Sequence, residues 1–525
     1  MGRIRALPLT AAVLAGAVLI SGASGADPRT PQALPGHPAP FLGTSVIGDG
    51  GLLAAVDSYG DIVDLRAPGP TGEARIDNPF ARQAAGTVPA DTGIVPAAAA
   101  GRRAPHPLWR ATALRQRYLP ATNVLVTRAT VSGAQLRIVD AARGARLARR
   151  LVVQGRPGQI LHLRLGVGVL TGAGFHCRAR SGSSAAGRRL SWRGRGELRA
   201  SLTCGFGALP AGAGGLISDA AHADRRWLAQ RRPLGGGAPA WARRMYARSL
   251  LVLRGLTDRR SGAAAAAARD RWAYVWPRDA GTVAIAFAAS GYRSEARRIA
   301  GFLARLDLAS GARFHGSGAP VDDGRILPGD SAGWVSAAAA ATGIEGRAPR
   351  PGAWRDRGDY GERNGDKGDY LANAIAGAAP GSEIRRLFAG TRGLQRRAAD
   401  RSSGLDSAAA WAVRPFSRPA LYPLVRSSLL TLASRANRYG LSPAQDWPRN
   451  ESWTAPAAWS AWSLAALGDR RAALSLLAAV RRAATPTGTI PERVGLESGL
   501  PRSATPLGWS HAFTILALRQ LYARR

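Results

Sequence analysis

The sequence predicts a multidomain protein in which an N-terminal antiparallel β-sandwich is followed by a C-terminal, all-helical half. At 525 residues the chain is too long for one ordinary hydrophobic core, so two domains are expected. Short alternating apolar runs dominate the first part, and helical periodicity dominates after Pro239. Because strands followed by helices are typical of separate domains, we expect a β-sandwich over residues 35–237 and a helical domain over residues 238–525.

Strands are expected wherever β-branched or alternating apolar runs lie between clusters of Gly, Pro, Ser and Asp. The clusters at residues 48–51 and 57–60 are typical turn-formers. Runs of this length and spacing favour a sandwich. The expected strands cover residues 45–53, 54–65, 123–130, 134–140, 151–153, 160–169, 190–192 and 198–204.

Helices are expected in segments of about 8 to 18 residues that are mostly apolar enough to be buried. Their number approaches that of a double-ring helical barrel, although an irregular bundle or a solenoid would fit the count as well. No fixed-period repeat appears, which makes the solenoid less favoured. The expected helices cover residues 240–256, 279–290, 294–307, 331–342, 369–378, 382–394, 406–413, 422–439, 454–466, 470–484 and 508–522.

The N-terminus has the pattern of a cleaved secretory signal over residues 1–26. Arg3 and Arg5 precede an apolar run at residues 7–20, and small residues then precede Asp27. The run is short for a membrane span, which needs about 20 residues, and an uncleaved anchor is the alternative. We therefore expect a secreted or cell-envelope-associated protein.

The net charge of +38 comes almost entirely from arginine, since Lys367 is the single lysine. The arginines are scattered as singles and pairs, whereas a nucleic-acid binder would cluster them or interleave them with aromatic residues. We expect no nucleic-acid partner, and loose association with an anionic cell envelope is a hypothesis.

The two cysteines, Cys177 and Cys204, would form a disulfide in an oxidising compartment or remain free, buried thiols. Neither their spacing nor their neighbours indicate a metal site. The histidines are scattered, and His511 is expected to be a packed or capping residue. We expect no metal and no organic cofactor.

Tryptophan, arginine and carboxylate residues concentrate in loops between the expected helices. In residues 272–280, three aromatic side chains precede Arg278 and Asp279. A first-turn anion with an arginine beside it on the surface would explain Asp279 but not the aromatic residues. Flat rings beside a guanidinium and a carboxylate suit a sugar, which has apolar faces and peripheral hydroxyls. Similar concentrations occur at residues 359–370, 446–453, 487–494 and 503–512.

At these residues the chain resembles the glycoside hydrolase family that contains glucoamylases, glucodextranases and some bacterial trehalases. Residues 274–280 match its motif Y-x-W-P-R-D followed by A or S. Residues 490–494 resemble L-x-E-Q followed by V or Y, and residues 506–512 match P-L-x-W-S, then H or Y, then A. The resemblance extends from about Pro239 to the C-terminus and, more weakly, over the preceding sandwich.

The resemblance implies an (α/α)6 six-hairpin toroid with a sugar pocket at one rim. Arg278 and Asp279 would hold the terminal glucose, and Glu492 would be the general base. Glu362, at the end of an Asp-x-x-Glu segment, would be the general acid. The aromatic residues expected to bind substrate are Trp276, Trp453 and Trp509.

Several positions depart from the family pattern. Gly361 stands where the family has a tryptophan before the acid, and Arg493 stands where it has a glutamine after the base. Residues 450–453 stand where members often have Gly-Asn-Pro-Trp or a similar run, and the cation Arg363 would lower the pKa of the acid, the wrong direction for a proton donor. Glu451 and Asp446 are therefore kept as further candidates for the acid.

The resemblance implies an inverting glycoside hydrolase that acts on terminal α-linked glucose of glucans, oligosaccharides or trehalose. Inversion requires one carboxylic acid to protonate the leaving oxygen and a second carboxylate to activate water. The alternative is a non-catalytic carbohydrate-binding or cell-envelope protein on a degenerate toroid. A phosphorolytic or transferase relative is a third interpretation, which Glu492 disfavours because phosphorolysis would replace the base with an anion pocket.

Overall fold

The computed structural model describes residues 31–77, 93–168, 172–180, 184–186, 189–269, 272–362, 366–448 and 450–522. The expected signal segment over residues 1–26 lies outside these ranges. Residues from Gln32 onward form one compact unit, and the description below concerns this unit alone. The expected boundary between residues 237 and 238 stays a prediction.

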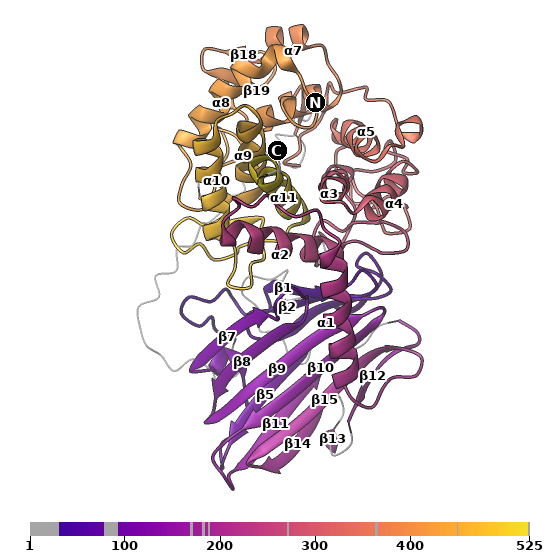
Figure 1. The fold of residues 1–525 in the computed structure, drawn as a ribbon, viewed down its shortest axis with the longest axis vertical. Coiled ribbons are helices and arrows are strands. Elements are labelled where there is room, and N and C mark those ends of the chain that lie inside the picture. The colour runs from indigo at the N-terminus through magenta and orange to yellow at the C-terminus, as the bar shows by residue number, and fades with distance from the viewer. Residues whose placement is uncertain are drawn as a thin grey trace, which may run out of the picture. The chain divides into compact units, whose positions relative to one another are not determined.

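Two antiparallel sheets make up the N-terminal half (Figure 1). In the described residues the larger sheet has the strand order β1-β2-β3-β5-β11-β14-β13, with β4 beside β3 and β6 beside β5. Its strands are β1 (Gly43–Gly48), β2 (Leu53–Asp57), β3 (Ile62–Arg66), β4 (Ala74–Asp77), β5 (Ile94–Ala100), β6 (His106–Pro107), β11 (Ile160–Val167), β13 (Ser184–Ala186) and β14 (Arg189–Arg195). The smaller sheet, in the order β12-β15-β10-β9-β8-β7, has β7 (Ala113–Tyr118), β8 (Leu125–Val131), β9 (Ala134–Arg143), β10 (Arg146–Gln154), β12 (Phe175–Ala179) and β15 (Glu197–Phe206).

The side-chain pattern of the strands explains why the sheets pack against each other. On β11 the alternate residues Leu161, Leu163 and Leu165 are buried, as expected for a strand with one core face. They share one apolar core with residues of the smaller sheet, such as Ile138 and Leu151. This packing agrees with the antiparallel, sheet-rich N-terminal half that the sequence predicts.

Several strand predictions need correction. The runs 45–53 and 54–65 were expected to be one strand each, but turns at residues 49–52 and 58–61 divide them into β1, β2 and β3. The turn-forming clusters at residues 48–51 and 57–60 lie at these two turns, so the expected strands were drawn through turns that the sequence does mark. Strands β5 and β7 were not expected, because β5 is mainly alanine and β7 alternates with arginine.

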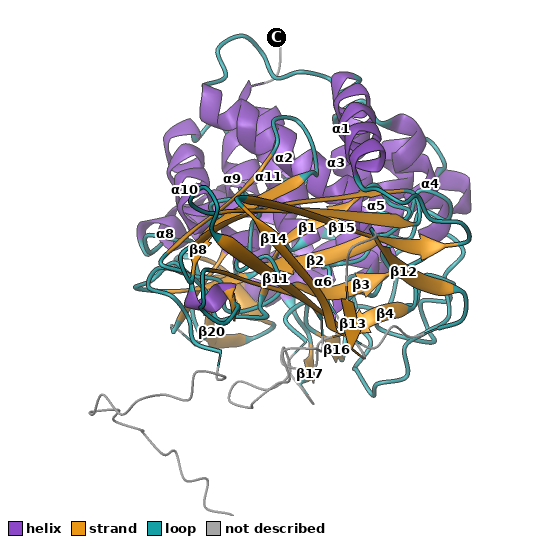
Figure 2. Cartoon of the chain, turned by 90° about the horizontal axis from the view of Figure 1, so that it is seen from below, coloured by secondary structure: helices purple, strands orange, loops and turns teal. Residues whose placement is uncertain are grey.

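The C-terminal half is helical: Figure 1 shows most helices and the two sheets in separate regions, and in Figure 2, seen from below, the long strands overlie the helices. The helices are α1 (Gly214–Ala229), α2 (Ala240–Leu256), α3 (Pro277–Ala289), α4 (Arg293–Leu303), α5 (Ser331–Thr342), α6 (Leu371–Ala376), α7 (Gly381–Phe388), α8 (Tyr422–Ser434), α9 (Thr454–Ala466), α10 (Arg470–Ala483) and α11 (Gly508–Tyr522). Helices α3, α9 and α11 are buried almost all round, whereas α4 and α10 bury one face only. No helix among the described residues is long and apolar enough to cross a membrane.

An all-helical C-terminal half was too strict an expectation, because short strands form in its loops. They are β16 (Arg357–Gly358), β17 (Lys367–Gly368), β18 (Ala389–Gly390), β19 (Gly393–Arg397), β20 (Asp400–Leu405), β21 (Glu451–Trp453) and β22 (Arg493–Gly495). The expected helix 382–394 ends at Phe388 and turns into the β18–β19 hairpin at Gly390. The expected helix 406–413 is a 3-10 helix (Ser407–Ala412), started by Asp406 accepting a hydrogen bond from the backbone N–H of Ala408. Helix α1 was missed inside the expected sandwich domain.

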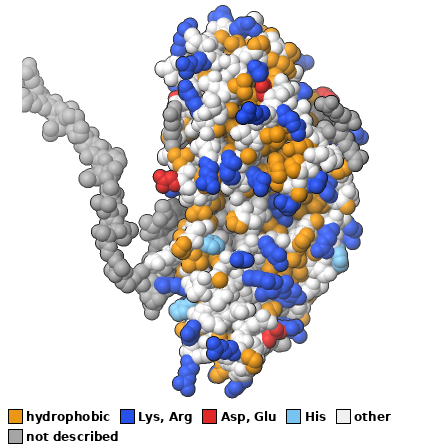
Figure 3. Space-filling model, turned by 60° about the vertical axis from the view of Figure 1, so that its left-hand side comes forward, with side chains coloured by type: hydrophobic (Ala, Val, Ile, Leu, Met, Phe, Trp, Pro, Cys, Tyr) orange, Lys and Arg blue, Asp and Glu red, His pale blue; other side chains and the backbone are white. Residues whose placement is uncertain are grey.

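Arginine side chains are spread over the surface, and Figure 3 shows a face with many basic and few acidic side chains. This distribution matches the scattered arginines of the sequence. A few of the described arginines are buried instead, and two of them, Arg149 and Arg396, are completely buried. Arg149 lies between the two sheets.

Arg149 joins the two sheets through charge and hydrogen bonds. From β10 it forms an ion pair with Asp140 on β9, with Nε 2.7 Å from the carboxylate. Its two terminal nitrogens also donate to the carbonyl oxygens of Gly60, in the turn between β2 and β3, and of Ile94 on β5, at 2.7 and 3.0 Å. The guanidinium therefore compensates a buried carboxylate and satisfies two carbonyls of the opposite sheet at once.

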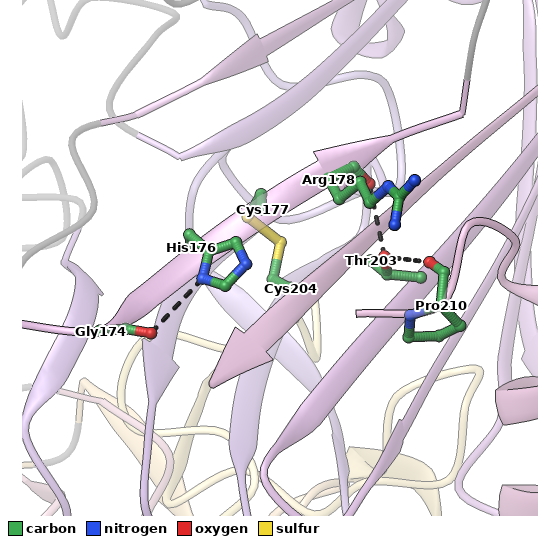
Figure 4. Close-up of a disulfide and its surroundings, with 7 residues drawn as sticks. All are labelled: Gly174, His176, Cys177, Arg178, Thr203, Cys204 and Pro210. Carbon is green, nitrogen blue, oxygen red and sulfur yellow. Dashed lines mark hydrogen bonds between the residues drawn. A yellow bond between two sulfur atoms is a disulfide. The ribbon is translucent and has the colours of Figure 1, made fainter. Parts of the chain in front are cut away.

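The two cysteines form a disulfide between neighbouring strands of the smaller sheet. Cys177 on β12 lies directly opposite Cys204 on β15, and the sulfur atoms are 1.98 Å apart (Figure 4). The structure thus pairs the two residues that the sequence left open between a disulfide and free thiols.

We predict that Arg149→Met lowers the free energy of unfolding by about 3–5 kcal/mol, because it leaves the Asp140 carboxylate buried without a cation. Urea unfolding followed by circular dichroism would measure the change. The control is Arg146→Met at an exposed position of the same strand, which should change stability by less than about 0.5 kcal/mol. Equal effects of the two variants would contradict this role of Arg149.

Candidate active site

One cavity of about 150 Å³ gathers all seven residues that the sequence predicted as catalytic or substrate-binding. These are Trp276, Arg278, Asp279, Glu362, Trp453, Glu492 and Trp509. Further lining residues include Trp272, Arg325, Tyr360, Gly361, Trp447 and Trp459. Loops that are far apart in the sequence therefore meet at a single, largely aromatic cavity.

The first motif lies at the start of α3, where Pro277 takes the first helical position and loses no hydrogen bond. Arg278 and Asp279 follow in the first turn and are 4% and 5% exposed. Their burial rules out the interpretation of a surface pair. Burial raises the pKa of Asp279 to about 7, although Arg278 opposes the shift.

Arg278 connects several parts of the cavity wall. Its Nη1 donates to the buried carboxylate of Asp330 at 3.1 Å, and its Nη2 lies 3.6 Å from Oε1 of Glu362. Its guanidinium carbon lies 4.8 Å from the centre of the Trp509 ring. Carboxylates and an aromatic face thus fix this cation from several sides.

Glu362 sits at a tight turn with a positive φ of 48°. Its Oε1 accepts a hydrogen bond of 2.5 Å from the indole N–H of Trp276, and its Oε2 forms an ion pair with Arg325. The carboxylate is therefore held at the cavity by partners from two other loops. Arg363, which follows it, lies outside the described residues.

Glu492 lines the cavity, and one of its carboxylate oxygens is buried without a hydrogen bond from the described residues. Its side chain is 15% exposed, and Oε2 accepts no hydrogen bond from the described residues. The nearest cation is Arg493, whose Nε lies 3.6 Å from this oxygen. Burial raises the pKa of Glu492, while Arg493 opposes the shift and Glu362 adds to it. The mutual influence of the two carboxylates agrees with their place on one cavity.

The loop that carries Glu492 is fixed on both sides. The backbone N–H of Ile490 donates to Nε2 of His511 at 2.9 Å, and Nδ1 of His511 is 2.8 Å from the hydroxyl of Ser249. On the other side the hydroxyl of Thr454 donates to the carbonyl of Pro491. Because Nε2 must accept a hydrogen bond, the ring is neutral, and burial lowers its pKa to about 3.

Gly361 leaves room for an aromatic ring from another loop. A Cβ atom at this position would lie 2.1 Å from Cη2 of Trp447, far inside van der Waals contact. Trp447 is 8% exposed, lines the cavity and packs edge-on to Trp453 with ring centres 5.7 Å apart. The indole that the family motif has before the acid is thus absent from position 361, and Trp447 supplies a ring beside it.

The two further candidates for the acid do not line this cavity. Glu451 forms an ion pair with Arg493 at 2.6 Å, and Asp446 forms one with the buried Arg396 at 2.8 Å. Among the described residues, neither is part of the cavity wall. Their contacts fix the loops that carry Trp447 and Trp453.

Sequence reasoning missed Arg325, Asp330 and Trp459 as parts of the site. Arg325 and Asp330 lie in a segment without aromatic residues, so nothing local marks them. Trp459 lies within α9, where its apolar neighbours indicate only a buried helix. Trp447 belongs to a loop rich in tryptophan, which was a usable signal.

No metal site accompanies the cavity within the described ranges. Among these residues, no three His, Cys, Asp or Glu side chains gather as ligands would.

Comparisons with known proteins find one family match and several similar structures. Residues 240–309 match the family model described as Glycosyl hydrolases family 15. The crystal structure of a bacterial glucoamylase complexed with acarbose is 13% identical with a TM-score of 0.69, and the match covers 92% of this chain and 94% of that chain. A glucoamylase from Saccharomycopsis fibuligera is 12% identical with a TM-score of 0.45, over 53% of this chain and 94% of that chain. Among curated proteins, none matches this chain significantly in sequence.

The first two of these findings give a family match at the start of the helical half and a similar overall fold. The resemblance to the glucoamylase-type glycoside hydrolases is confirmed, and the chain has the fold of the bacterial glucoamylase.

We predict that Gly361→Ala lowers the free energy of unfolding by about 1–3 kcal/mol, because the new methyl group collides with the Trp447 ring. The cost should be smaller in a Trp447→Ala background, with a coupling of at least about 0.5 kcal/mol in a double-mutant cycle. Gly346→Ala is the matched control, since a Cβ there meets no atom within 4 Å. Additive effects at positions 361 and 447 would contradict the contact.

We predict that buried, neutral His511 makes the fold sensitive to mild acid. Its pKa falls from about 6.5 in the unfolded chain to about 3 in the folded one, so the unfolded state binds more protons between these values. The contribution of neutral His511 to the free energy of unfolding is present above pH 6.5. It falls by about 2 kcal/mol between pH 7 and pH 5. Urea unfolding at both pH values should show a smaller difference for His511→Gln. The exposed residue His222, changed to Gln, should leave the difference as in the wild type.

Proposed function

We propose that the protein is an inverting glycoside hydrolase that releases terminal α-linked glucose from glucans, oligosaccharides or trehalose. The observation that carries the proposal is the pair of carboxylates, Glu362 and Glu492, that reach one aromatic cavity from distant loops. The match to the family model and the fold of a bacterial glucoamylase support it.

The proposed architecture of the helical half is an (α/α)6 toroid. In such a double ring, inner helices are surrounded by protein, and outer helices bury one face. Helices α3, α9 and α11 have the burial of inner helices, and α4 and α10 have that of outer helices. The loops that line the cavity lead into inner helices α3, α9 and α11.

In the proposed mechanism Glu492 is the general base. Its carboxylate takes a proton from a water molecule while that water attacks the anomeric carbon. Protonated Glu362 gives its proton to the glycosidic oxygen, whose bond to the anomeric carbon breaks. The leaving group departs as an alcohol, and the released glucose has the opposite configuration at its anomeric carbon. After the reaction Glu492 carries the proton and Glu362 is ionised.

The other cavity residues would position the sugar and stabilise the charge that develops. Arg278 and Asp279 offer a donor and an acceptor to hydroxyl groups, and the indole rings offer apolar faces. Arg325 occupies Oε2 of Glu362, so the acid can reach the leaving oxygen only when this ion pair opens. A substrate that displaces Arg325 would therefore free Oε2 of Glu362 to protonate the leaving oxygen.

We predict that Glu492→Gln lowers kcat for maltose or trehalose hydrolysis by at least about 10²–10⁴-fold, because the base is lost while the side-chain volume is kept. Hydrolysis would be followed by glucose release, and the first anomer formed would be identified by NMR. Glu497→Gln, on the same loop but exposed, is the matched control and should keep full activity. An active Glu492→Gln variant would remove this residue from the mechanism.

Glu362→Gln tests the acid separately. Fluoride is a good leaving group and needs little protonation. Hydrolysis of a glucosyl fluoride should therefore regain much of its rate in Glu362→Gln but not in Glu492→Gln.

The contact between Arg325 and Glu362 favours a second function, sugar binding without hydrolysis. Maltose bound by the wild type with no product after long incubation would establish that function instead.

A further inference from the structure

A second concave surface lies away from the cavity, between the two halves of the compact unit. It has a volume of about 660 Å³ and shares no lining residue with the candidate active site. We call it the basic groove, because its charged lining residues are the arginines Arg117, Arg225, Arg231, Arg244, Arg248 and Arg481. No aspartate or glutamate lines it among the described residues.

The six arginines come from four separate elements. Arg117 belongs to β7, Arg244 and Arg248 to α2, and Arg481 to α10. Arg225 lies on α1, and Arg231 follows the end of that helix. Because strand and helices approach from different sides, their guanidinium groups surround the groove instead of lying along one helix.

These arginines lack carboxylate partners in the described part of the chain. None of the six has a described carboxylate oxygen within 4.0 Å. Two of them, Arg231 and Arg248, are half-buried, and most other buried or half-buried arginines described in the helical half do form ion pairs. The carboxylate that acts on Arg248 from a distance is Asp224, which is itself paired with Arg254. The positive charge of the groove is therefore not neutralised locally by described side chains.

Arg248 is held in place in the groove by three contacts. Its nitrogens donate to the side chain of Asn123 at 2.8 Å and to the carbonyl of Thr122 at 2.7 Å. Its guanidinium carbon lies 3.7 Å from the centre of the Tyr118 ring. Arg244 stands one turn before it on α2, and like charges at this spacing destabilise a helix. A bound anion would relieve this repulsion.

The geometry favours phosphate groups on a flexible chain. A guanidinium binds a phosphate through two parallel hydrogen bonds, and the tetrahedral oxygens of a phosphate accept such pairs from several sides. A carboxylate is planar and presents its oxygens in one direction. Arginines from four elements around one groove therefore suit successive phosphates better than successive carboxylates.

We propose that the basic groove binds a flexible polymer with closely spaced phosphate groups, and that it holds the protein on such a polymer independently of the candidate active site. Figure 3 shows that basic side chains outnumber acidic ones over a wide face, so the proposal requires that the groove binds more tightly than the general surface charge does.

The test compares two variants of equal net charge. Arg225→Gln, Arg244→Gln and Arg481→Gln together remove three exposed charges from the groove. The control changes three exposed arginines of β14, Arg189, Arg193 and Arg195, to Gln. Binding of a fluorescent inorganic polyphosphate chain to the full-length protein is measured by polarisation over a range of salt concentrations. Thermal unfolding verifies that both variants fold.

We expect the groove variant to bind polyphosphate about tenfold more weakly at low salt, because it loses three exposed arginine–phosphate contacts. The control should bind as the wild type does. The slope of log K against log salt should fall by about 2 in the groove variant, since each lost phosphate contact releases about 0.7 fewer counterions on a single strand.

Three results would overturn the proposal. Equal weakening in both variants would mean that the general surface charge binds the polymer. Orthophosphate that competes as well as the polymer, per phosphate, would reduce the groove to a site for a small anion. Polyglutamate bound as tightly as polyphosphate, with the same dependence on the groove arginines, would make the partner an acidic polypeptide.

Discussion

The hydrogen bond from the backbone N–H of Ile490 to the buried ring of His511 holds the loop of Glu492 in place. The imidazole must stay neutral to accept this bond, and burial keeps it so. Helix α11 carries His511 and Trp509 together, so one helix positions both the loop and a wall of the cavity. The same loop reaches the sandwich, where the hydroxyl of Thr489 donates to the carbonyl of Thr44. The sandwich therefore helps to hold the loop that carries the proposed base.

Buried carboxylates and a few arginines together determine the charge and the carboxylate pKa values in the cavity. Arg278 faces Asp279, Asp330 and Glu362, and burial raises the pKa of Asp279 to about 7 despite this cation. Glu492 lines the cavity with one oxygen buried without a hydrogen bond, and the described cation within 4 Å of it is Arg493. Carboxylates in a poorly solvated site respond strongly to each other, which is how two chemically identical side chains take different roles.

The substitution of tryptophan by glycine at position 361 illustrates the limit of motif comparison. Taken alone, Gly361 indicates a lost aromatic wall and weakens the assignment of Glu362. In the fold, the absence of a Cβ atom is what lets Trp447 lie beside this turn. Motifs located Trp276, Arg278, Asp279 and Glu492, because their residue types are adjacent in sequence. Arg325 and Asp330 could not be found in this way, since their contacts with the site are formed only by folding.

The sequence by itself determined the order of a strand-rich and a helical half, the aromatic, arginine and carboxylate residues of the cavity, and the two cysteines. Local periodicity and adjacent residue types carry this information without the fold. Only the tertiary structure decided that Arg149 joins the two sheets, that Glu362 pairs with Arg325, and that Glu451 and Asp446 lie outside the cavity wall. These outcomes depend on which distant segments meet when apolar surface is buried, and that meeting has no local signature.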